Sequence, residues 1–265
     1  HCEAQYSLGQ KYTEDKSRHK DNEQAIFWLK KAALQGHTFA SNALGWTLDR
    51  GEAPNYKEAV VWYQIAAESG MSYAQNNLGW MYRNGNGVAK DYALAFFWYK
   101  QAALQGHSDA QNNLADLYED GKGVAQNKTL AAFWYLKSAQ QGNRHAQFQI
   151  AWDYNAGEGV DQDYKQAMYW YLKAAAQGSV GAYVNIGYMY KHGQGVEKDY
   201  QAAFEWFTKA AECNDATAWY NLAIMYHYGE GRPVDLRQAL DLYRKVQSSG
   251  TRDVSQEIRE TEDLL

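Results

Sequence analysis

Residues 74–106 read AQNNLGWMYRNGNGVAKDYALAFFWYKQAALQG, and residues 110–142 repeat this stretch with few changes as AQNNLADLYEDGKGVAQNKTLAAFWYLKSAQQG. The pattern opens with an alanine that is followed four residues later by Leu or Ile. The seven starting alanines, spaced by 36 residues except for one interval of 34, are Ala4, Ala40, Ala74, Ala110, Ala146, Ala182 and Ala218. A period of this length indicates stacked helix pairs, because one unit alone cannot bury its own apolar face.

Each repeat carries signals for two helices joined by a loop. The first helix is expected to end at a glycine, which adopts the left-handed conformation without a Cβ penalty. These glycines are Gly51, Gly85, Gly121, Gly157, Gly193 and Gly229. An Asp or Asn then predicts the N-cap of the second helix, because its side chain accepts hydrogen bonds from the orphan amides of the first turn. These caps are Asp21, Asn55, Asp91, Asn127, Asp163, Asp199 and Asp235.

The second helix contains an aromatic pair such as Trp98-Tyr99 and then two small residues. It is expected to close at a residue that tolerates the left-handed conformation, and Asn is the next best choice after Gly. The closing residues are Gly36, Gly70, Gly106, Gly142, Gly178, Asn214 and Gly250.

The combined order is Ala-x-x-x-Leu-Gly-x-x-Tyr-x-x-Gly-x-Gly-Val, then Asp-Tyr-x-x-Ala-x-x-Trp-Tyr-x-x-Ala-Ala-x-x-Gly. It resembles the Sel-one-like repeat (SLR), a relative of the tetratricopeptide repeat (TPR) with a longer glycine-containing loop. The resemblance covers residues 4 to about 250, although Glu14-Asp15-Lys16-Ser17 replaces the glycine loop of the first repeat. It implies an all-α, right-handed α/α solenoid of about seven stacked helix-turn-helix repeats, and an adaptor that binds peptides or folded proteins on its concave face.

We expect one solenoid domain over residues 1–265. Its repeats are predicted at 4–39, 40–73, 74–109, 110–145, 146–181, 182–217 and 218–253. The tail residues Val254, Ile258, Thr261 and Leu265 have helical spacing, so residues 254–265 are predicted to form a C-terminal capping helix over the last layer.

Composition narrows the functional classes. A formal net charge of −5 and the lack of a Lys/Arg run argue against a nucleic-acid partner. No apolar run approaches the length needed to span a membrane. Cys2 and Cys213 belong to distant layers, so they are not expected to pair, and unpaired cysteines favour a reducing compartment such as the cytoplasm. Because the chain starts inside a first helix without Met, it is expected to be a fragment, and a periplasmic or secreted location stays open.

The predicted partner-binding surface comes from helix geometry. At 100° per residue, offsets 0, +4 and +8 from the starting alanine share the inward face, whereas +2, +6 and +9 point the opposite way. The +2 row is Asn42, Asn76, Asn112, Phe148, Val184 and Tyr220. The +6 row is Trp46, Trp80, Asp116, Trp152, Tyr188 and Ile224, and the +9 row is Asp49, Arg83, Glu119, Asn155, Lys191 and His227.

These outward rows combine large aromatics with varied charge, which is typical of a binding hot spot. The leading hypothesis is a non-catalytic adaptor whose groove captures a protein or peptide, with affinity from the aromatics and selectivity from the +9 row. The plainer interpretation is that the aromatics lean onto the adjacent repeat as core. A second functional hypothesis is a structural scaffold that self-associates end to end.

An enzyme and a cofactor site are the remaining alternatives. Toroids of stacked helix pairs can hydrolyse sugars with two carboxylates, and Asp116 with Glu119 is the nearest candidate pair. The Gly-x-Gly-Val loops lack the Lys-Ser/Thr of a phosphate cradle. No Cys-x-x-Cys occurs and no His pair brackets a Glu, so neither a metal nor a cofactor is expected, and His192 and His227 are expected to face solvent.

Overall fold

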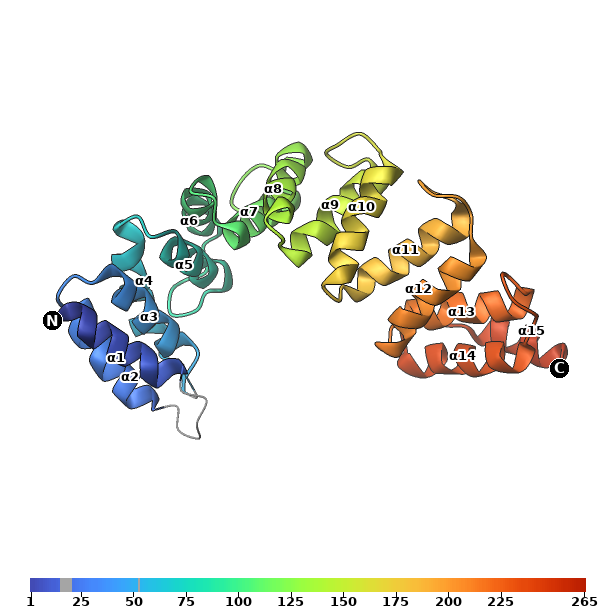
Figure 1. The fold of residues 1–265 in the computed structure, drawn as a ribbon, viewed down its shortest axis with the longest axis horizontal. Helices are drawn as coiled ribbons and strands as arrows, with labels where there is room; N and C mark the ends of the chain where they lie inside the picture. Colours follow the sequence, from blue (N-terminus) through green and yellow to red (C-terminus); the bar gives the residue numbers. More distant parts are fainter. Residues whose placement is uncertain (15–20, 52) are drawn as a thin grey trace. The chain divides into compact units, whose positions relative to one another are not determined.

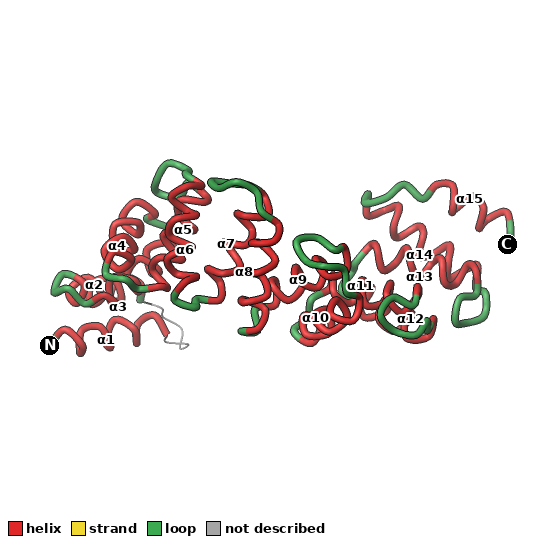
Figure 2. The backbone as a smooth tube through the Cα atoms, turned by 90° about the horizontal axis from the view of Figure 1, so that it is seen from above, coloured by secondary structure: helices red, strands yellow, loops and turns green. Residues whose placement is uncertain are grey.

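The computed structural model describes residues 1–14, 21–51 and 53–265, and every regular element in these ranges is an α-helix (Figure 1). Loops connect the helices throughout the described ranges (Figure 2). The helices are α1 (Cys2–Glu14), α2 (Asn22–Ala33), α3 (Thr38–Asp49), α4 (Tyr56–Glu68), α5 (Ser72–Asn84), α6 (Tyr92–Leu104), α7 (Ser108–Asp120), α8 (Lys128–Gln140), α9 (Arg144–Ala156), α10 (Tyr164–Ala176), α11 (Val180–His192), α12 (Tyr200–Glu212), α13 (Ala216–Tyr228), α14 (Leu236–Ser249) and α15 (Ser255–Asp263). The predicted all-α fold of helix-pair repeats is confirmed. The replaced loop at residues 15–17 lies outside the described ranges.

The helices form two compact units, residues 1–141 (unit 1) and residues 142–265 (unit 2). Unit 1 contains α1 to α8, and unit 2 contains α9 to α15. Within each unit an odd-numbered helix packs on the even-numbered helix that follows, and this second helix packs on the next first helix. The expectation that both units belong to one continuous solenoid stays a prediction.

The helix ends follow the predicted caps closely. Asp91 accepts hydrogen bonds from the amides of Ala93 at 2.8 Å and Leu94 at 2.9 Å. All seven predicted Asp and Asn caps bond in this way, at Asp21, Asn55, Asp91, Asn127, Asp163, Asp199 and Asp235. Asn214 closes its helix with φ 62°, the sole non-glycine positive φ in the described chain. Local side-chain chemistry therefore sets the length of each helix.

One predicted helix stop differs from the structure. Gly85 is a left-handed C-cap with φ 76°, as expected. In the second repeat, however, α3 ends at Asp49 with Arg50 as its C-cap, and Gly51 has no positive φ. The loop of this repeat is two residues shorter, so the chain leaves the helix earlier and needs no left-handed glycine.

Buried tyrosines from the second helices form the centre of the packing. Tyr63, Tyr99 and Tyr171 are fully buried. Gly45 and Gly79 on the preceding first helices allow Tyr63 and Tyr99 to approach closely, because a Cβ added at Gly79 would lie 2.8 Å from Cδ1 of Tyr99. In these repeats one large ring therefore packs against a small residue, which is the close packing expected of protein interiors.

Helix α15 packs on α14 at the end of unit 2. Val254, just before its start, and Thr261 are fully buried. In the preceding repeats, first helices begin 36 residues apart at Val180 and Ala216, whereas α15 begins at Ser255, three residues later than the repeat would place it. A loop therefore occupies the position of a first helical turn.

Candidate partner-binding surface

The +6 aromatics lie at the surface of both units. Trp46 on α3 and Trp80 on α5 are 39% and 42% exposed. Trp152 on α9 and Tyr188 on α11 are 38% and 46% exposed. By contrast, inward residues such as Leu78 are fully buried. The period of the helix thus separates the two sets onto opposite sides of the same elements.

Two hollows adjoin the exposed tryptophans of unit 1. One has a volume of about 300 Å³, and its lining includes Tyr6, Asn42 and Trp46. The other has a volume of about 270 Å³ and is lined by Asp49, Arg50, Asn76, Asn77 and Trp80. The Arg50 guanidinium carbon lies 5.4 Å from the centre of the Trp46 ring, within cation–π range. The first-helix surface of unit 1 is therefore uneven, with aromatic, amide and charged walls.

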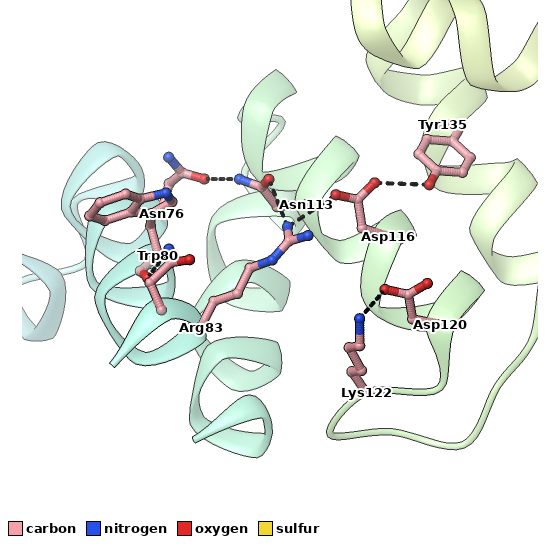
Figure 3. Close-up of polar contacts among 9 residues, drawn as sticks. Asn76, Trp80, Arg83, Asn113, Asp116, Asp120, Lys122 and Tyr135 are labelled. Atoms are coloured by element: carbon pink, nitrogen blue, oxygen red, sulfur yellow. Dashed lines mark hydrogen bonds and ion pairs between the residues drawn. The ribbon is translucent and has the colours of Figure 1, made fainter. Parts of the chain in front are cut away.

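Asparagine side chains link successive first helices of unit 1. Asn77 Nδ2 donates to Asn42 Oδ1 at 3.2 Å. Asn113 Nδ2 donates in the same way to Asn76 Oδ1 at 3.0 Å (Figure 3). These bonds join the +3 position of one repeat to the +2 position of the previous repeat. Asn42 and Asn76 therefore fix neighbouring repeats to each other as well as facing outward.

A second polar network surrounds Asp116 (Figure 3). Its Oδ2 accepts from Arg83 at 3.0 Å, and its Oδ1 accepts from the Tyr135 hydroxyl at 2.9 Å. Burial alone would lower the pKa of Arg83, but the hydrogen bond and charge of Asp116 raise it above its usual value. Glu119 Oε1 lies 3.7 Å from Lys128 Nζ. Both members of the carboxylate pair considered for glycoside hydrolysis are thus engaged in contacts between structural elements.

Two residues of the predicted surface lie largely inside unit 1. The Asp49 side chain is 9% exposed, and its Oδ2 accepts from the Tyr63 hydroxyl at 2.8 Å. Burial raises the pKa of Asp49, and the Tyr63 hydrogen bond and the charge of Arg50 offset part of that rise. Asn112 is likewise 9% exposed. Asp49 and Asn112 were both expected to face outward, but their side chains are buried in the packing of unit 1.

Several predicted residues of unit 2 are partly buried or contact a neighbouring element. The ring centres of Phe148 and Tyr171 are 5.7 Å apart. Lys191 Nζ lies 2.7 Å from Glu230 Oε2, and the Lys191 side chain is only 11% exposed. Asn155 is half-buried on α9. In this unit the +9 position of α11 therefore serves mainly to pair adjacent repeats.

Helix α15 covers part of α13. His227 Nδ1 lies 3.1 Å from Thr261 Oγ1, and the Tyr220 hydroxyl donates to Glu257 Oε1 at 3.3 Å. The expectation that His227 faces solvent is wrong, because the added helix packs over it. His192 is exposed, as expected.

An exposed aromatic row on the second helices was not anticipated. Its members, each 46–49% exposed, are Phe27, Phe97, Phe133 and Tyr169. Each packs edge-on against the next residue, as Phe97 does against Trp98 with ring centres 4.9 Å apart. An aromatic residue directly before the tryptophan of these second helices is the signal that could have revealed this row.

The described residues contain no group of three or more His, Cys, Asp or Glu side chains that could hold a metal ion. Cys2 and Cys213 are free thiols. Within residues 1–14, 21–51 and 53–265, no helix has the length and apolar character required to cross a membrane.

Comparison with known proteins identifies the repeat. Seven consecutive segments match the Sel1 repeat, at residues 2–37, 38–71, 72–107, 108–143, 144–179, 180–215 and 216–245. The chain is 35% identical to a protective antigen of uropathogenic Escherichia coli that displays an SLR fold, with a TM-score of 0.87 over 94% of this chain and 54% of that chain. It is 33% identical to a Sel1 repeat protein from Oxalobacter formigenes, with a TM-score of 0.74 over 81% of this chain and 86% of that chain. This chain thus spans about half the length of the E. coli protein. The chain belongs to the Sel1 repeat family.

Proposed function

We propose that the first-helix surface of this chain binds a peptide or protein partner without catalysing a reaction. Sel1 repeat proteins are generally scaffolds for protein–protein interaction. The observation that carries the proposal is the exposure of the +6 aromatics, because Trp46, Trp80, Trp152 and Tyr188 are all 38–46% accessible, whereas the residues at offsets 0 and +4 of the same helices are fully buried. Large amphipathic rings at such positions supply contact area at low entropic cost, which is why they dominate interface hot spots.

Selectivity in this proposal comes from the polar residues around each aromatic. In unit 1, Asn76 lies in the same hollow as Trp80, together with Arg50. The asparagine links hold these amides in fixed positions, so a partner meets a preorganised set of donors and acceptors. Preorganisation lowers the entropic cost of binding.

The test replaces Trp80 and Trp152 singly with alanine and measures partner capture from lysate together with thermal stability. Matched controls are Phe97→Ala in unit 1 and Tyr169→Ala in unit 2, because these side chains are 47% and 49% exposed on the second helices. We expect recovery of the partner to fall at least about tenfold for the tryptophan variants alone, the loss typical of a hot spot. Each pair should show a similar, small change in melting temperature.

Two results would overturn the proposal. Equal capture by the tryptophan variants and their controls would show that the +6 row does not contact a partner. A collapse of stability confined to Trp80→Ala and Trp152→Ala would show that these side chains act as core.

A further inference from the structure

A hollow in unit 2 lies between α11, α13 and the loop that precedes α15. Its volume is about 520 Å³, and its walls include Val184, Tyr188, Thr217, Tyr220, Asn221 and Arg252. It exists because α15 begins late. In the preceding repeats the chain is already helical at the position equivalent to Arg252, whereas here residues 251–254 are a loop. The place of one helical turn is therefore open.

The charge of this pocket has one sign. Arg252 is the single charged side chain among the described lining residues, and its guanidinium carbon lies 4.1 Å from the centre of the Tyr220 ring. No carboxylate in the described chain forms an ion pair with Arg252. The adjacent Asp253 is engaged by Ser255, whose amide and hydroxyl donate to its Oδ1 at 3.0 Å and 2.6 Å. The Arg252 guanidinium thus contacts the Tyr220 side chain but forms no ion pair within the described chain, so donors remain for a carboxylate from outside.

The opposite wall is apolar and aromatic. Tyr188 is 46% exposed, its ring is held 4.0 Å from His192, and Val184 lies one helical turn before it. Glu257 accepts from the Tyr220 hydroxyl but is not among the residues that line the hollow. An occupant would therefore meet an aromatic surface on one side and a guanidinium on the other.

We infer that this pocket binds a peptide residue that presents a carboxylate next to an apolar side chain. The apolar group packs on Tyr188 and Val184, and the carboxylate pairs with Arg252, whose planar donors match carboxylate geometry. The inference rests on the proposed function and deepens it, because it names the chemistry of the partner at one place on the same surface. An acidic side chain and a free chain terminus can both supply the carboxylate.

The test uses three small probes in NMR titrations of the whole chain. N-acetyl-phenylalanine carries a terminal carboxylate, N-acetyl-phenylalaninamide is its neutral isostere, and N-acetyl-Asp-Phe-amide carries a side-chain carboxylate. We expect at least one carboxylate probe to bind about tenfold more tightly than the neutral isostere, the gain typical of one charge-assisted pair. The carboxylate probe that shows this tighter binding identifies whether a chain terminus or an acidic side chain supplies the carboxylate.

Variants assign that gain to the pocket. Arg252→Gln should remove the advantage of the carboxylate probe and leave the neutral probe unchanged, whereas Arg237→Gln, an exposed arginine of α14 outside the pocket, should change neither. Tyr188→Ala should weaken all three probes. Equal binding of charged and neutral probes, or an unchanged advantage in Arg252→Gln, would overturn the inference.

This experiment is separable from the test of the proposed function. If the probes behave as expected but the Trp80 and Trp152 variants capture partner normally, the inference about the pocket is supported and the proposal for the wider binding surface is wrong. If the tryptophan variants lose partner but the probes do not distinguish charge, only the inference about the carboxylate fails.

Discussion

His107 is an N-cap whose function depends on its protonation state. Its Nδ1 accepts a hydrogen bond from the Ala110 amide at 3.3 Å, so the single ring proton must be on Nε2, which has no partner in the described structure. The Tyr73 ring packs against it with centres 4.6 Å apart. Burial lowers the pKa of His107 below its usual 6.5, and the charge of Asp109 opposes this only in part. A second proton would break the cap.

We therefore expect stability to decrease in acid because of this one residue. The unfolded chain protonates His107 more readily than the folded chain, so the contribution is complete above the unfolded pKa of about 6.5 and declines as the pH falls from there toward the lower pKa of the folded state. His107→Asn should remove that decline and keep the cap, because Asn143 caps α9 at the same repeat position with a 3.0 Å bond to Ala146. Urea unfolding across this pH range measures the effect.

An unchanged dependence of unfolding free energy on pH in His107→Asn would show that the buried cap does not account for the decline in acid.

At the scale of elements, the second glycine of the Gly-x-Gly loops determines how closely the loop approaches the previous repeat. Gly195 has φ +71°, and a Cβ added there would lie 2.6 Å from the Tyr164 carbonyl oxygen at the start of α10. Gly87 meets the backbone of Tyr56 in the same way in unit 1. Gly178 has a similar φ of +79° but has nothing within 4 Å of the added Cβ. A comparison of Gly195 with Gly178 therefore separates the cost of backbone strain from the cost of steric overlap.

Alanine at both positions should therefore destabilise the chain by different amounts. Gly178→Ala carries the left-handed strain alone, about 1–2 kcal/mol. Gly195→Ala adds an overlap with backbone atoms that cannot move away by rotation, about a further 1–3 kcal/mol. Thermal unfolding of the two variants side by side measures the difference. Equal losses would mean that the loop moves away freely from α10.

Caps and turns could be predicted from the sequence because each depends on residues only a few positions apart, as Asp91 and Gly85 show. The exposure of Trp80 also follows from a fixed angle per residue. The inward turn of Asp49 and Asp116 could not be predicted in this way. The tyrosine that bonds to Asp49 lies 14 residues later in the chain, and the tyrosine that bonds to Asp116 lies 19 residues later. Both tyrosines belong to second helices, but the two acids occupy different first-helix positions, +9 and +6. Periodicity predicts which residues share a face of a helix, whereas packing determines which polar side chain turns toward the next helix.

At the scale of the whole molecule, the two terminal helices bear on the scaffold hypothesis. Helix α1 exposes Glu3, Ser7 and Lys11 to solvent, and α15 exposes Arg259 and Glu260. Stable association of two protein surfaces buries roughly 800 Å² on each partner and uses an apolar centre. Neither terminal helix presents such a centre along these residues.

We therefore expect the chain to remain monomeric, with a mass near 30.2 kDa by light scattering from dilute to concentrated solution. Exposed Leu264 and Leu265 are the apolar exceptions at the C-terminal end, so Leu264→Ser combined with Leu265→Ser provides the control. The wild-type and doubly substituted chains should give the same mass. A wild-type mass that rises with concentration, and returns to the monomer value in the double variant, would instead favour end-to-end assembly through that terminus.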